Sequence, residues 1–273
     1  MANDAELVRI DIGRGIATIT LDSQHNRNAL SRQLLTELHQ ALDQAEDAEA
    51  RAIVLTHAGP AFCSGADLRE RSSGPPDSGP MVAALERLMD TERPTLAAVN
   101  GAVRAGGIGL MASCDLVVVD ESVDFALTEV RIGVAPAIIA VPILRRVAPG
   151  RIAAAMLTGE RFDARRALEI GLITHVTSDV VETVDEICSG VLHGAPSAIA
   201  ETKRLLATVP GMERAAALSE MRALSERLFS SDDAAEGMAA FSERRPPRWS
   251  PEDRKSTRLN SSHSSVSRMP SSA

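Results

Sequence analysis

Apolar and polar positions repeat with two different periods along the chain. Near the N-terminus, Val8 to Ile12 and Ile16 to Leu21 show the two-residue period of strands and flank Gly13-Arg14-Gly15, which predicts a β-hairpin. Ser31 is a residue type that caps helices, and the apolar positions after it recur at helical spacing. Continuous apolar runs then predict three buried strands, at Ala52 to Thr56, Thr95 to Val99 and Asp115 to Val119.

The last third of the chain shows the helical period alone. A final apolar run from Leu172 to Val176 precedes four segments with helical spacing: Val180 to Leu192, Pro196 to Ala207, Glu213 to Leu228 and Asp232 to Phe241. A further helix is predicted from Met81 to Asp90, after the Gly/Pro/Ser-rich stretch from Arg71 to Pro80. We therefore expect an α/β core over residues 1–195 and a helical region over 196–252.

Two segments of small residues stand about 40 positions apart, each directly after a predicted buried strand. The first contains Ser64-Gly65-Ala66-Asp67, and the second contains Ala105-Gly106-Gly107. Small residues let a ligand approach the backbone, and N–H groups freed at the start of a helix can point at negative charge. Two such groups directed at one carbonyl oxygen form an oxyanion hole. This pair is the strongest indication of chemistry in the sequence.

Composition excludes several other functions. The net charge is −8 without a basic cluster in the predicted folded region, which argues against nucleic acid as a partner. No apolar run is long enough to cross a bilayer, and no signal peptide pattern opens the chain. The histidines are scattered without metal-ligand spacing, so we expect no metal site. Three sparse cysteines indicate a reduced, cytoplasmic protein, and Cys63 is expected to be a buried residue rather than a nucleophile.

The C-terminal stretch differs from everything before it. From Asp253 the chain reads DRKSTRLNSSHSSVSRMPSSA, which has no apolar periodicity and resembles the translation of a sequencing-library adapter. We therefore expect residues 253–273 to be a non-native tail and leave them out of the fold prediction.

The ordered set of motifs resembles the crotonase superfamily of enoyl-CoA hydratases and isomerases. The set comprises A-F-C-S-G-A-D-L at Ala61 to Leu68, N-G-A-V-R-A-G-G-I-G-L at Asn100 to Leu110, and F-A-L-T-E-V-R-I-G-V-A-P at Phe125 to Pro136. The resemblance implies a crotonase/ClpP-like spiral of ββα units with a C-terminal helical trimerisation region. It also implies a homotrimer or homohexamer and an acyl-CoA substrate. No cofactor is bound permanently, because coenzyme A arrives as part of the thioester.

The resemblance also assigns roles to single residues. It places the oxyanion donors at the N–H groups of Ala66 and Gly106 and a catalytic carboxylate at Glu129. A second carboxylate would stand three residues after Gly106, but that position is Gly109. Apolar neighbours of Glu129 predict a partly desolvated carboxyl with a raised pKa, which suits acid–base work near neutrality. Dienoyl-CoA isomerisation is disfavoured, because Ala137 stands where that reaction needs another acid.

The remaining expected contacts concern coenzyme A. The resemblance places the adenine against the backbone near Ser64, Ala66 and Asp67, and the pantetheine and phosphate path near Arg27. Gly65 and Leu68 of the same segment are also expected to contact coenzyme A. Phe241 and Arg244 match a C-terminal motif that closes the adenine pocket, often across a subunit boundary.

Three activities stay open with one carboxylate. The chain is nearest to a hydratase-like subgroup, including methylglutaconyl-CoA hydratase-like proteins, in which Gly also replaces the first glutamate. This favours hydration of a 2-enoyl-CoA. Enoyl-CoA isomerisation between the 3- and 2-positions and a catalytically silent acyl-CoA-binding role are the alternatives.

Overall fold

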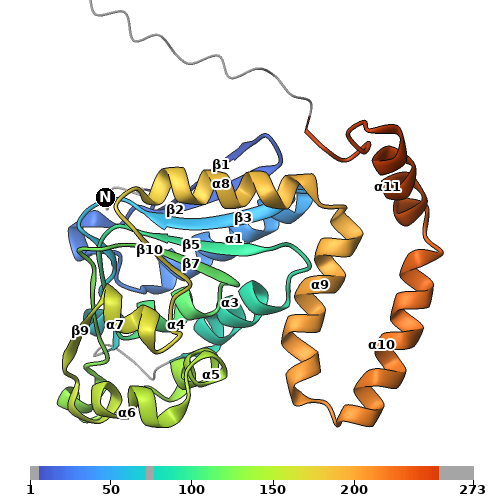
Figure 1. Cartoon of the computed structure of the whole chain (residues 1–273). Coiled ribbons are helices and arrows are strands. Elements are labelled where there is room, and N and C mark those ends of the chain that lie inside the picture. Colours follow the sequence, from blue (N-terminus) through green and yellow to red (C-terminus); the bar gives the residue numbers. More distant parts are fainter. Residues whose placement is uncertain (1–5, 72–76, 252–273) are drawn as a thin grey trace, which may run out of the picture.

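The computed structural model describes residues 6–71 and 77–251, and within them the chain forms two sheets surrounded by helices (Figure 1). The larger sheet has six strands in the order β1-β2-β3-β5-β7-β10. Their bounds are β1 Val8–Gly13, β2 Ile16–Leu21, β3 Ala52–His57, β5 Thr95–Val99, β7 Leu116–Asp120 and β10 His175–Thr177. The smaller sheet has the order β4-β6-β8-β9, with β4 Ala61–Cys63, β6 Ala102–Arg104, β8 Asp124–Ala126 and β9 Arg161–Asp163.

From β3 to β8 consecutive strands alternate between the two sheets, and this alternation makes the chain a spiral. The pairs β3–β4, β5–β6 and β7–β8 each place their first strand in the larger sheet and their second in the smaller one. Neighbouring turns of the spiral pair in parallel, as in β3 with β5 and β4 with β6. The mixed α/β architecture predicted from the sequence is thereby confirmed.

Helices follow the second strand of each turn and complete the ββα units. The core helices are α1 Arg32–Asp47, α2 Leu68–Arg71, α3 Gly79–Asp90, α4 Gly106–Ala112, α5 Ala137–Arg146, α6 Pro149–Thr158, α7 Ala164–Glu169 and α8 Val180–His193. The Ser31 hydroxyl accepts a hydrogen bond from the N–H of Leu34, so the predicted cap of α1 is confirmed. No helix among the described residues is long and apolar enough to cross a membrane.

Two apolar clusters hold these layers together. The main cluster fills the space between the two sheets and helices α1, α3, α4 and α5, and includes the fully buried Phe62 and Phe125. A second cluster lies under α8, which covers the other face of the larger sheet and buries Val184 and Cys188 against Val54 and Leu96 (Figure 1). The two faces of the larger sheet are therefore both covered, as continuous apolar strands require.

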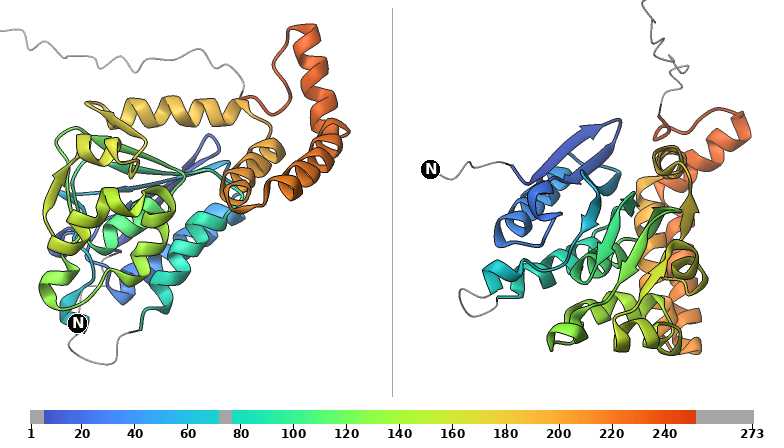
Figure 2. Two further views of the ribbon diagram at one scale, coloured as in Figure 1. Left: turned by 60° about the horizontal axis from the view of Figure 1, so that its bottom comes forward. Right: turned by 90° about the vertical axis from the view of Figure 1, so that its left-hand side faces the viewer.

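The C-terminal helices extend away from the sheets. They are α9 Pro196–Thr208, α10 Arg214–Phe229 and α11 Asp232–Glu243, and Figure 2 shows them as an arm at one side of the core. A buried lysine attaches the base of the arm: Lys203 Nζ lies 2.8 Å from Asp115 Oδ2 and donates to the carbonyls of Leu88 and Arg93. The predicted helices of this region are confirmed, whereas the domain boundary near residue 195 stays a prediction.

Two predicted elements differ from the observed ones. The run Leu172 to Val176 yields only the short strand β10, which starts at His175. At the preceding Thr174 the backbone N–H donates to the carbonyl of Val117, but the N–H of Val117 donates to the Thr174 hydroxyl instead of to a backbone carbonyl. Helix α3 begins at Gly79, two residues before the predicted start. The predicted tail at 253–273 lies outside the described residues, as do positions 72–76 of the Gly/Pro/Ser-rich stretch.

Candidate active site

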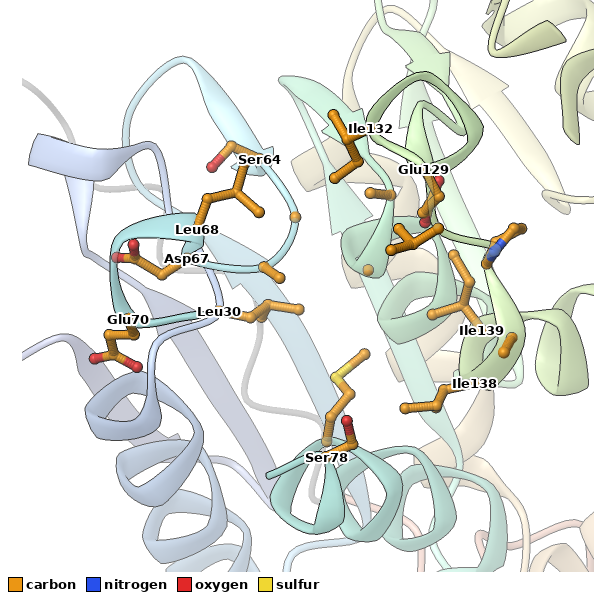
Figure 3. Close-up of a pocket in the computed structure, with 18 of the residues that line it drawn as sticks. Leu30, Ser64, Asp67, Leu68, Glu70, Ser78, Glu129, Ile132, Ile138 and Ile139 are labelled. Carbon is orange, nitrogen blue, oxygen red and sulfur yellow. The ribbon is translucent and has the colours of Figure 1, made fainter. Parts of the chain in front are cut away.

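A cavity of about 550 Å³ opens between the two small-residue segments and helices α3 and α5. One wall consists of Leu30 and residues 64–68. The opposite wall consists of Ala105, Gly106, Thr128, Glu129, Ile132 and residues 134–139. Figure 3 shows Leu30, Leu68, Ile132, Ile138 and Ile139 facing this space, with the Glu129 carboxylate among them. The lining is therefore mainly apolar, as is usual for a small-molecule site, and its charged members among the described residues are Arg32, Asp67, Glu70, Asp77 and Glu129.

The two small-residue segments touch each other at the cavity. A Cβ placed on Gly65 would stand 3.0 Å from the Ala105 Cβ and 3.9 Å from the Gly106 nitrogen. Gly65 has a φ of +97°, and Ala105 has a φ of +47° although it carries a side chain. Both conformations turn the chain sharply at the strand ends, and a larger residue at Gly65 would separate the segments.

Local hydrogen bonds leave the two predicted donors free. Residues 30 and 66 form an isolated parallel bridge, in which the N–H of Leu30 donates to Gly65 and the N–H of Asp67 donates to Leu30. That pattern does not use the N–H of Ala66. Gly106 is the first residue of α4, and the N–H groups of a first helical turn have no partner within the helix. Neither N–H has a hydrogen-bond acceptor among the described residues, and both residues line the cavity.

Glu129 provides the ionisable group on the opposite wall. It begins a 3-10 helix, Glu129–Ile132, which Leu127 and Thr128 connect to β8. Its Oε2 is buried and has no hydrogen-bond partner. Among the described side chains, His57 Nδ1 is the other buried polar atom without a partner. Burial raises the pKa of the Glu129 carboxyl above its ordinary value of 4.5, although the residue's own N–H opposes the shift.

The neighbouring cation does not neutralise this carboxylate. Arg131 turns away from the cavity and its Nε donates to the carbonyl of Thr158 at 3.0 Å. Glu129 has no ion-pair partner within the described part of the chain. An unpaired carboxyl facing an apolar cavity next to free N–H groups is able to take up or release a proton there.

The position of the missing second carboxylate is filled by another side chain. Gly109 is buried in α4, and a Cβ placed on it would stand 2.3 Å from Ile139 Cγ2 and 2.6 Å from Ile139 Cβ. Ile139 is itself a cavity residue, as is Ala137 at the start of α5. The cavity therefore has a hydrocarbon surface where a carboxylate at position 109 would enter.

The residues expected to contact coenzyme A fall into two groups. Ser64, Gly65, Asp67 and Leu68 line the cavity beside Ala66. Asn26 fixes this segment, because its carbonyl accepts from the Ser64 hydroxyl at 3.0 Å and its side-chain amide donates to Asp67 Oδ2 at 3.3 Å.

The second group lies outside the cavity lining. Arg27 is exposed, and its carbonyl accepts from the N–H of Ser64 at 3.0 Å. Phe241 is 88% exposed on α11 and Arg244 ends that helix, so both stand on the arm shown in Figure 1. Their role at the adenine pocket stays a prediction that involves a neighbouring subunit.

Cys63 lies behind the oxyanion segment and not in the cavity lining. It is fully buried, and desolvation raises the pKa of its thiol to about 12, so the thiol stays protonated at neutral pH. Its expected structural role is supported by a close contact, since a Cβ on Gly107 would stand 2.6 Å from the Cys63 Cβ.

Sequence reasoning did not identify Met81 and Ile139 as cavity residues. Met81 was noted as the first apolar position of a helix, and that helix carries it to the cavity wall. Ile139 follows Pro136 in a continuous apolar run, in which helical periodicity does not distinguish an inward position from an outward one.

Comparison with known proteins identifies the family of the chain. The profile of the enoyl-CoA hydratase/isomerase family matches residues 11–252. A mitochondrial enoyl-CoA hydratase domain-containing protein 3 from Danio rerio is 35% identical over 88% of this chain and 86% of its own length. A carnitinyl-CoA dehydratase from Salmonella arizonae is 32% identical over 90% of this chain and 98% of its own.

Solved structures lead to the same family. The crystal structure of an enoyl-CoA hydratase from Mycobacterium avium is 41% identical and superimposes with a TM-score of 0.68, covering 90% of this chain and all of that one. A family profile that spans most of the chain, together with these relatives, places the protein in the enoyl-CoA hydratase/isomerase family.

Proposed function

We propose that this protein is an enoyl-CoA hydratase that adds water across the double bond of a 2-enoyl-CoA thioester with Glu129 as its single acid–base. The observation that carries the proposal is the buried, unpartnered Oε2 of Glu129, which shares one cavity with the free N–H groups of Ala66 and Gly106. The hydratase and dehydratase names of the relatives support this direction of chemistry over other reactions of the family.

The two N–H groups stabilise the charge that develops on the thioester oxygen. When water adds at Cβ, electrons move through Cα to the carbonyl and give an enolate oxygen. The N–H groups of Ala66 and Gly106 donate to that oxygen, and the N-terminus of α4 adds a favourable dipole. Removal of one such donor typically costs about 3–4 kcal/mol of transition-state stabilisation.

Glu129 moves the proton in two steps. Its carboxylate accepts one proton from the water as the water oxygen bonds to Cβ. The resulting carboxylic acid then donates this proton to Cα as the enolate collapses. The net change is the addition of one water, and Glu129 returns to its ionised form. A raised pKa suits this cycle, because the group has to hold the proton between the steps.

The contact between Gly109 and Ile139 favours a second candidate, enoyl-CoA isomerisation. One carboxylate suffices to remove a proton from C2 of a 3-enoyl-CoA and return it to C4, and no water is needed. The hydrocarbon surface of Ile139 suits a reaction from which water is excluded. A catalytically silent acyl-CoA binder is less well supported, because it would gain nothing from a buried carboxyl without a partner.

The proposed assembly is a homotrimer or a hexamer of two trimers. Apolar side chains on the arm support it, since Leu206, Leu218, Phe229 and Phe241 are all at least 67% exposed in the single chain. In such an assembly Phe241 and Arg244 of one subunit would reach the adenine of another.

A substrate panel tests the activity. The purified protein is given crotonyl-CoA and 3-hexenoyl-CoA, and absorbance of the conjugated thioester is followed. Hydration removes the absorbance of crotonyl-CoA, whereas isomerisation creates it from 3-hexenoyl-CoA. Glu129→Gln should lower either rate at least ~100-fold while saturated acyl-CoA still binds, because the oxyanion donors are backbone groups.

The matched control is Glu121→Gln, since Glu121 is exposed at a turn outside the cavity. This variant should keep the full rate. Turnover that persists in Glu129→Gln would place the chemistry elsewhere. Binding of acyl-CoA without turnover of either substrate would support the silent alternative.

A further inference from the structure

The deep end of the cavity is closed by a residue pair rather than by a single side chain. Gly109 and Ile139 are 30 positions apart in sequence and come from α4 and α5, and both are buried. A Cβ on Gly109 would stand 2.3 Å from Ile139 Cγ2, 2.6 Å from its Cβ and 3.2 Å from its Cα. Two of these atoms are fixed by the helix backbone, so rotation of Ile139 cannot relieve the contact. Ile139 therefore occupies volume that most residues at position 109 would claim.

This pair lies one helical turn beyond the proposed oxyanion donor. Gly106 and Gly109 are three residues apart on α4, so they share one face and are separated by about 4.5 Å along the helix axis. The proposed thioester oxygen is held at Gly106. An acyl chain that continued inward from this carbonyl along α4 would meet the place that Ile139 covers.

Exposure along the wall identifies Ile139 as its inner end. Ile132 is 59% exposed at the mouth, Ile138 is half-buried, and Ile139 is 5% exposed. Figure 3 shows these three side chains on the wall that carries Glu129. Leu35 and Met81 are the other buried apolar side chains of the lining. Hydrocarbon from three elements therefore lines this part of the cavity, and Glu129 is the charged residue on the same wall.

We infer that Ile139 is a specificity-determining residue that closes the acyl subsite and limits the bulk of an uncharged, apolar acyl group. The inference rests on the proposed acyl-CoA function but not on the choice between hydration and isomerisation. Gly109 then has a structural role, because the absence of a side chain at this position leaves room for Ile139, and Ile139 forms the pocket surface there. An acyl group that ends in a carboxylate would bury this charge without a partner at the inner end.

Binding of unreactive saturated thioesters tests this inference without any turnover. Dissociation constants for butanoyl-, hexanoyl- and octanoyl-CoA are measured by calorimetry for the wild type, Ile139→Ala and Ile139→Val. Truncation opens space continuous with the cavity, so the preference for octanoyl- over butanoyl-CoA should rise about tenfold in Ile139→Ala, with Ile139→Val between it and the wild type. Glutaryl-CoA should bind more weakly than hexanoyl-CoA to all of them.

The matched control is Ile143→Ala. Ile143 is on the same helix and fully buried, but it is not part of the cavity lining. The Ile143→Ala variant should have a lower melting temperature than the wild type but the same preference for octanoyl- over butanoyl-CoA. An unchanged preference in Ile139→Ala, or an equal change in Ile143→Ala, would overturn the inference. Failure of the wild type to bind any of these thioesters would instead refute the proposed function itself. The milder Ile139→Val keeps the test available if the alanine variant unfolds.

Discussion

Replacing Gly109 by alanine should lower the melting temperature of the protein, whereas the same replacement at Gly190 should raise it. Both glycines lie inside α-helices, α4 and α8, so both variants gain the same helix propensity. They differ in surroundings: Gly109 faces Ile139 at 2.3 Å, and a Cβ on Gly190 would meet nothing within 4 Å. Comparison of the two variants therefore separates the effect of core packing on stability from the effect of helix propensity.

The magnitudes come from two opposing effects. Alanine in place of glycine within a helix stabilises the fold by about 0.5–1 kcal/mol. Overpacking a close-packed core costs about 1–3 kcal/mol, and the upper part applies because Ile139 Cβ and Cα cannot move without moving α5. We expect a net loss of about 1–2 kcal/mol for Gly109→Ala, or roughly 2–8 °C, and a gain of roughly 1–4 °C for Gly190→Ala.

Thermal unfolding followed by circular dichroism measures both variants at the same protein concentration. The additional variant Gly109→Ala/Ile139→Gly removes the two closest contacts and leaves the 3.2 Å contact with the Cα. Its stability loss should be smaller than the sum of the two single losses, because the residues share one volume. A melting temperature of Gly109→Ala equal to that of Gly190→Ala would refute the packing argument and would reopen position 109 to a carboxylate.

Three further predictions concern pH, assembly and the C-terminus. Because burial raises the pKa of Glu129, kcat/KM should increase with pH as the carboxyl ionises, with a midpoint above pH 4.5. A midpoint at or below pH 4.5 would contradict the role of Glu129 as the base. Light scattering at micromolar concentration should show a trimer or hexamer, and Leu218→Asp with Phe229→Asp should shift it toward monomer; a monomeric wild type would disprove the assembly. Removal of residues 253–273 should leave the melting temperature and the activity unchanged, because that stretch has no apolar periodicity to bury. A large drop in either would exclude a non-native tail.

Local signals predicted much of the fold. The hairpin was predictable because Arg14 and Gly15 supply the positive φ values that a two-residue turn requires. Strands β3, β5 and β7 of the larger sheet were predictable as continuous apolar runs. The smaller sheet was missed because its strands have three residues each, which is too short for any period to emerge.

The backbone groups of the candidate site were predictable from the sequence, whereas one of its side-chain contacts was not. The two segments were predicted from small residues at strand ends, and the family resemblance placed the donors at Ala66 and Gly106. The structure leaves both N–H groups free beside the cavity. The contact between Gly109 and Ile139 was not predictable, since it depends on how closely α5 packs on α4. From the sequence, Gly109 is interpreted as a position that lacks the family's carboxylate. The structure shows that the side chain of Ile139 fills the space beside it. Restoring glutamate there by a single substitution is consequently disfavoured on steric grounds.

Several groups at the site are held in states that cost folding free energy. Ala105 adopts a positive φ, which costs about 1–3 kcal/mol for a residue with a side chain. The N–H groups of Ala66 and Gly106 have no acceptor among the described residues, and the Glu129 carboxyl is buried without a partner. The rest of the fold, with its two covered sheet faces, has to offset these costs. A thioester oxygen between the two N–H groups would satisfy them both, so the ligand that fits this site is one whose carbonyl gains negative charge during reaction.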